Sequence, residues 1–282
     1  MSAISDLRPS PIAGTWYDDN PQRLARSVEG YIDDAELPEL KGEVIGVIAP
    51  HAGHRYSGPV AGYAFAAVRG LTPQLVAVIS PMHQPYQQPL ITTAHAAYAT
   101  PLGNVPVDKE AVEDLSGRLK ARLGFGLSHV INDTEHSLEI ELPFLQRVLK
   151  AEFKLLPVMV RQVDPTTSRE LGAALAEALS GRDALLVAST DLSHFYSQPE
   201  ANALDDEMLR VVESYLPDEL FKAEAEGRGF ACGLGALAAV LWAGKALGAD
   251  QVKVLRHATS GDVTGDFSSV VGYGAAVLLK TK

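Results

Sequence analysis

Three histidines follow closely on segments that are expected to be buried strands. His51 and His83 come just after the apolar β-branched segments 44–49 and 75–80, and His194 comes a few residues after a third such segment. In a parallel sheet the carboxyl ends of the strands meet at one edge, where ligands bind. We therefore expect these imidazoles to lie near one another, although a hydrogen bond to the loop backbone explains each histidine equally well when it is taken alone.

The chain has one cysteine, Cys232, which precedes Gly233 at the expected start of a helix. The amide groups and the dipole of a helix N-terminus favour the thiolate, which is also the form that binds metals. A set of two histidines and one cysteine suits iron, copper or zinc and leaves coordination positions open. The alternative is a buried structural cysteine, because cysteine also behaves as a small apolar side chain.

Two carboxylate–imidazole pairs could add acid–base chemistry. Asp191 stands three residues before His194 and could orient it or raise its pKa, or could instead cap the next segment. Glu135 and His136 form a second pair at an expected helix start, where His136 is either a support for the metal ligands or an ordinary first-turn residue.

Aromatic residues lie close to these segments. Trp16 and Tyr17 could form the lip of a pocket, together with Tyr56, or could anchor an N-terminal arm to the body of the protein.

The order of expected elements predicts the fold. Apolar β-branched segments alternate with amphipathic helical segments, which favours an α/β fold with a mostly parallel or mixed sheet covered on both faces. We expect one domain spanning residues 1–282, with residues 1–19 as an irregular arm packed on it. We also expect a short edge hairpin from 90–93 and 96–99, and a helix over 137–150 that Pro143 kinks.

Composition excludes several classes of function. The 282 residues carry a formal net charge of -11, and no cluster of Lys and Arg is long enough to follow a nucleic-acid backbone. No segment approaches the roughly 18 apolar residues of a membrane span, and the first residues lack the apolar stretch of a signal peptide. We therefore expect a cytoplasmic protein that binds neither nucleic acid nor membrane.

Taken together, several short motifs resemble those of one family over nearly the whole chain. In order, they are Gly14-Thr-Trp-Tyr17, Ala49-Pro-His-Ala-Gly53, Ser80-Pro-Met-His83, Glu135-His-Ser-Leu-Glu139, Ser189-Thr-Asp-Leu-Ser-His194, Cys232-Gly233 and Gly272-Tyr-Gly274. This combination resembles the Memo-like proteins, which are similar in fold to class III extradiol ring-cleavage dioxygenases of the LigB type. The resemblance implies a three-layer α/β/α sandwich.

The resemblance also implies roles for particular residues. His51, His83 and Cys232 take the three ligand positions for iron(II) or copper, with zinc as another candidate, and His194 takes the acid–base position. Cysteine stands where the dioxygenases have a carboxylate, and a thiolate changes the electronics of iron and is itself oxidised. Microbial members of the family resemble parts of systems that contain a radical-SAM protein, which implies such a partner.

Two functions of different class follow. The first is a metal-binding redox protein of the kind of a dioxygenase-like, non-haem iron enzyme that takes a small-molecule substrate. The second is a non-catalytic module that binds a peptide or ligand in a cleft beside Trp16, Tyr17 and Tyr56. A zinc hydrolase is a third, weaker hypothesis.

Overall fold

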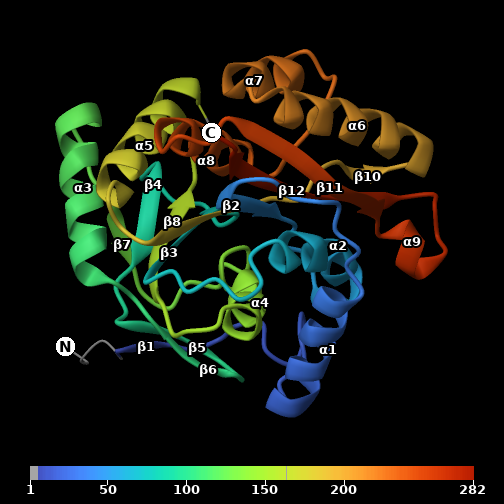
Figure 1. Cartoon of the computed structure of the whole chain (residues 1–282), viewed down its shortest axis with the longest axis horizontal. Helices are drawn as coiled ribbons and strands as arrows, with labels where there is room; N and C mark the ends of the chain where they lie inside the picture. Colours follow the sequence, from blue (N-terminus) through green and yellow to red (C-terminus); the bar gives the residue numbers. More distant parts are fainter. Residues whose placement is uncertain (1–5, 163) are drawn as a thin grey trace.

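The computed structural model describes residues 6–162 and 164–282, and its centre is a mixed β-sheet with helices on both faces (Figure 1). The sheet has the order β10-β12-β2-β9-β3-β8-β4-β7, and β11 also pairs with β12. Its strands are β2 (Glu43–Ala49), β3 (Leu75–Pro81), β4 (Leu90–Thr93), β7 (Ser128–Val130), β8 (Lys154–Val160), β9 (Ala184–Ser189), β10 (His194–Tyr196), β11 (Gln251–Thr259) and β12 (Val270–Lys280). The predicted three-layer α/β/α architecture with a mixed central sheet is confirmed.

Helices form the two outer layers (Figure 1). One layer contains α1 (Pro21–Asp33), α2 (His54–Ala66) and α4 (Leu142–Val148), of which α2 packs directly on the sheet. The other contains α3 (Lys109–Leu123), α5 (Pro165–Leu179), α6 (Gln198–Ser214), α7 (Pro217–Ala225) and α8 (Leu234–Ala246). The short helix α9 (Gly261–Thr264) follows β11. Among the described residues, no helix combines the length and apolar character that crossing a bilayer requires.

The four central strands explain where chemistry can occur. β2, β9, β3 and β8 are neighbours and run parallel, so their carboxyl ends lie at the same edge of the sheet. Both faces of these strands are covered, and Val76, Val78 and Val187 are fully buried. This burial accounts for the almost continuous apolar sequences of the strands.

The N-terminal arm packs on the body but is less irregular than predicted. Its strand β1 (Leu7–Arg8) runs parallel to β5 (Ala97–Thr100), which pairs in turn with β6 (Gly103–Pro106). Residues 1–5 of the predicted arm lie outside the described residues. The predicted hairpin of 90–93 with 96–99 is wrong, because β4 joins the main sheet between β8 and β7 while β5 belongs to the small sheet.

The predicted helix over 137–150 is shorter in the structure. A 3-10 turn, η1 (Glu139–Glu141), leads into α4, which begins at Leu142. Pro143 therefore lies in the first turn of α4, where its missing N–H costs nothing, and it does not kink a longer helix. The residues between β7 and η1, 131–138, therefore form a loop and not the first turn of a helix.

Candidate metal centre

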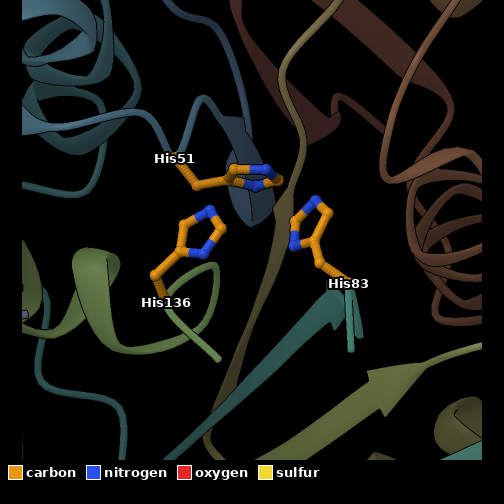
Figure 2. A group of neighbouring side chains, drawn as sticks. All are labelled: His51, His83 and His136. Atoms are coloured by element: carbon orange, nitrogen blue, oxygen red, sulfur yellow. The ribbon is translucent and has the colours of Figure 1, made fainter. Parts of the chain in front are cut away.

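Three histidines converge at the carboxyl edge of the sheet (Figure 2). His51 follows β2, His83 follows β3, and His136 comes from the loop between β7 and η1. Each offers a ring nitrogen, and these nitrogens lie within 4.8 Å of one another. The rings of His83 and His136 are stacked with centroids 4.8 Å apart, and the ring of His51 meets both of them edge to face. Such a spacing allows one ion to contact all three imidazoles.

Ser189 at the end of β9 fixes the tautomer of His51. The Ser189 hydroxyl donates its only proton to the carbonyl of Ser137, with Oγ and O 2.6 Å apart. Its oxygen must therefore accept the hydrogen bond from Nδ1–H of His51, which lies 2.9 Å away. The lone pair of Nε2 of His51 is then available to a metal ion, as in metal sites where a neighbouring group binds the other ring nitrogen.

Glu135 orients the other two imidazoles. Its carboxylate accepts from the backbone N–H of His83 at 2.6 Å and from Nδ1 of the same residue at 2.9 Å. The same carboxylate lies 3.3 Å from Nδ1 of His136. Glu135 is almost completely buried, so these contacts replace the hydration that it has lost. One carboxylate therefore directs Nε2 of both His83 and His136 to the centre.

The surroundings of His51 and His136 favour the uncharged form of these two imidazoles. Burial, reinforced by the neighbouring imidazoles, holds the pKa of His51 well below its usual value. Burial also lowers the pKa of His136 to about 4, although the charge of Glu135 opposes the shift. Burial alone would raise the pKa of Glu135. The hydrogen bond from His83 and the charge of His83 lower it by more, so the net shift is downward. Neutral imidazoles next to an ionised carboxylate are the state that binds a metal ion.

Cys232 lies beside this cluster, just before α8. Its Sγ is 3.1 Å from Nε2 of His51 and accepts the backbone N–H of Asp191 at 3.2 Å. Burial, together with the charge of Asp191, raises the pKa of the thiol. This shift is opposite to the direction predicted from the helix start, because the sulfur is buried and lies next to the carboxyl group of Asp191. The thiol must lose its proton when the sulfur binds a metal.

Asp191 supports His51 and Cys232. Its Oδ1 accepts the backbone N–H of His51 at 2.7 Å, and its Oδ2 lies 4.0 Å from Nε2 of the same residue. Burial raises the pKa of Asp191 to about 7, although backbone N–H groups oppose this shift. These contacts do not support the hypothesis that Asp191 orients His194. Nδ1 of His194 instead donates to the carbonyl of Leu192 at 2.8 Å.

His194 is partly buried at the start of β10, and its ring contacts two aromatic rings. The centroids of Phe195 and Phe230 lie 5.7 and 5.8 Å from that of His194. Because Nδ1 is bound to the Leu192 carbonyl, Nε2 is the nitrogen that can exchange a proton with a ligand. Burial lowers the pKa of His194, and the charge of His83 acts in the same direction.

The predicted aromatic residues divide into two roles. Tyr17 is buried and its hydroxyl donates to Glu139 at 2.6 Å, so it anchors the arm. Trp16 is partly exposed, and its ring lies 4.0 Å from that of His136. Trp16, Tyr56 and Tyr273 line a cavity of about 470 Å³ next to the residue after His51.

His54 does not join the cluster. It opens α2, and its Nε2 donates to the carbonyl of Ile140 at 2.9 Å. Its ring packs against Phe144 and Tyr17, away from the other histidines.

No local sequence pattern pointed to Arg8, which is extensively hydrogen-bonded near the site. Its guanidinium is buried and binds both carboxylate oxygens of Asp133, at 3.1 and 2.7 Å, and the carbonyl of Glu135 at 2.7 Å. It also pairs with Glu139 and lies over the ring of Tyr98. Arg8 therefore holds the loop that carries Glu135 and His136.

Comparison with known proteins agrees with the motif pattern. The family described as "Memo-like protein" matches residues 8–277. A "MEMO1 family protein" of Nitrosopumilus maritimus is 33% identical over 95% of this chain and 98% of its own length. Another from Thermotoga neapolitana is 35% identical, covering 96% of this chain and 99% of its own length.

A solved structure shares the fold. The uncharacterized protein JW3007 from Escherichia coli K12 superposes with a TM-score of 0.51 at 14% identity, covering 83% of this chain and 100% of that one.

Proposed function

Because the chain belongs to the Memo-like protein family, we propose that it is a metal-binding redox protein with iron(II) or copper at the His51 and His83 centre. The observation that carries the proposal is the convergence of three imidazoles within 4.8 Å of one another, at the edge where an α/β sheet binds ligands. Imidazole nitrogen suits iron, copper and zinc alike, and a thiolate favours copper(I) or zinc.

The donor set fits such an ion. His51 and His83 each have one ring nitrogen held by a protein group, which leaves the other for coordination. For the third ligand there are two candidates: Cys232, which lies 3.1 Å from Nε2 of His51, and His136, which completes the imidazole cluster. A bound iron or copper ion would supply one-electron redox chemistry to the site.

The chain's own residues handle protons. With Nδ1 of His194 bound to the Leu192 carbonyl, Nε2 is the nitrogen that would accept or donate a proton. Asp191, with a pKa raised to about 7 by burial, can hold a proton next to His51 at neutral pH. Asp191 and His194 have separate hydrogen-bond partners, so substituting one leaves the hydrogen bond of the other in place.

Metal analysis of protein purified without oxygen tests the proposal. We expect about one iron or copper ion per chain, lost in His51→Ala. Comparing Cys232→Ser with His136→Gln identifies the third ligand, since only the true ligand should be required for full occupancy. His129→Gln is the matched control, because His129 is an exposed imidazole on β7. Undiminished metal in His51→Ala, Cys232→Ser and His136→Gln would reject the assignment.

The cavity beside Trp16 and Tyr56 favours a second candidate, a module that binds a ligand without turnover. Oxygen uptake by metal-loaded protein with a panel of catechols separates the two functions. Uptake that His194→Gln abolishes supports an enzyme. Peptide binding that survives a chelator, without uptake, supports the module.

A further inference from the structure

Asp205 on α6 is a buried carboxylate near His194 that the metal centre does not use. It is 0% exposed, its Oδ1 accepts the backbone N–H of Ser193 at 2.9 Å, and its Oδ2 lies 2.8 Å from Nε2 of His257 on β11. A buried carboxylate persists only where hydrogen bonds or a partner compensate for its lost hydration. These bonds connect α6 and β11 to the residue directly before His194.

Gly272 on β12 is the second part of this arrangement. A Cβ atom at Gly272 would lie 1.8 Å from Oδ2 of Asp205, so only glycine leaves room for the carboxylate. The backbone of Gly272 donates to the carbonyl of Ser193 at 2.8 Å and accepts from the N–H of Leu192 at 2.9 Å. The close approach of Asp205 thus explains why the first residue of the closing Gly272-Tyr-Gly274 motif is glycine.

The backbone beyond His194 shows how firmly this segment is held. In the pairing of β10 with β12, His194 faces Val271 and Tyr196 faces Val270, so Phe195 is an extra, bulged residue. Phe195 has a φ of 65°, a conformation that bulky residues rarely adopt. Such strain persists where the surrounding structure imposes it, and bulges near active sites commonly redirect a side chain.

We propose that Asp205, held by His257, is a positioning residue that fixes His194 at the metal centre. This inference rests on the proposed role of His194 as the proton carrier. Asp205 and Gly272 together bind both backbone polar groups of Ser193, and Gly272 also binds the N–H of Leu192, whose carbonyl holds the His194 ring. Moving Asp205 would therefore move the imidazole.

The charge of Asp205 also acts on His194. Burial lowers the pKa of His194, the Leu192 carbonyl and the charge of Asp205 oppose that effect, and the charge of His83 adds to it. His51 interacts electrostatically with the ring as well, and the rings of Phe195 and Phe230 pack against it. The charge of Asp205 thus opposes the lowering of the His194 pKa, by less than the hydrogen bond to the Leu192 carbonyl does.

NMR of the histidine rings in the full chain, treated with a chelator, tests the proposal. Asp205→Asn retains an oxygen for Ser193 but removes the charge, so the titration midpoint of His194 should move to lower pH. Asp206→Asn is the matched control, since Asp206 is the exposed neighbour on α6. A midpoint unchanged in Asp205→Asn, or moved equally by Asp206→Asn, would overturn the inference. Because no ion or turnover is required, failure here is distinct from failure of the metal site.

A double-mutant cycle tests the positioning itself. Gly272→Ala should shift the His194 ring resonances and lower the Tm, because its Cβ collides with Asp205. In the Asp205→Ala background the collision is relieved, so Gly272→Ala should add little further change. If the effects of the two substitutions on the His194 resonances simply add, Asp205 does not position this histidine.

Discussion

Replacing Arg8 by methionine should destabilise the protein strongly, although Arg8 lies near the start of the chain. The substitution keeps a long unbranched side chain and removes the charge. It leaves Asp133 and Glu139 buried without their cation, since these side chains are 1% and 0% exposed. Removing one partner of a buried ion pair costs about 3–5 kcal/mol.

The structure places the expected loss towards the middle of that range. Two carboxylates lose their partner, which increases the cost. Glu139 can take up a proton more readily than an ordinary glutamate, because burial raises its pKa, and this reduces the cost. We expect about 4 kcal/mol, a large part of the roughly 5–15 kcal/mol by which a domain is stable.

Denaturant unfolding of Arg8→Met, monitored by circular dichroism, measures this loss. Arg122→Met is the control, because Arg122 also bridges two carboxylates, Glu170 and Glu177, but at the surface, and it should cost much less. Adding Asp133→Asn to Arg8→Met should recover part of the loss. Equal losses in the two arginine variants, or no recovery, would refute the reasoning.

Three further outcomes are expected. Glu135→Gln should weaken metal binding by about 10- to 100-fold in calorimetric titrations, because an amide orients His83 less firmly. The pKa of Asp191 rises on folding from 3.8 to about 7, so its stabilising contribution is complete below about pH 4 and is lost as the pH rises through 7. Unfolding free energies measured at pH 5 and at pH 9 should therefore differ by about 3 kcal/mol less in Asp191→Asn than in the parent. Gly233→Ala should lower the Tm, since its Cβ would lie 2.5 Å from the carbonyl oxygen of Ser189.

The central strands were predictable because their sequences are almost continuously apolar. A strand buried on both faces must have such a sequence, and residues directly after it must lie at the edge of the sheet. This argument placed His51 and His83 together without coordinates. It failed for the segment 90–99, where short strands of similar composition join two different sheets.

The sequence did not reveal groups whose behaviour depends on distant parts of the chain. His136 was expected as a support or a helix-start residue, and it joins the cluster because the helix begins only at Leu142. The protonation of Cys232 depends on its burial beside Asp191, which no local pattern records. The ion-pair partner of Arg8 is Asp133, which lies 125 residues later in the chain. The sequence around Arg8 therefore does not indicate its role.

The separation of His51 from Cys232 has a consequence for biosynthesis. The two residues are 181 positions apart in the chain. At ordinary synthesis rates the ribosome needs roughly 10 to 40 s to travel between them. During that interval the first imidazole is already made while the sulfur has yet to be added. The contact between the Cys232 sulfur and Nε2 of His51 can therefore form only late in translation or after it, by which time most of the sheet beneath the site has been synthesised.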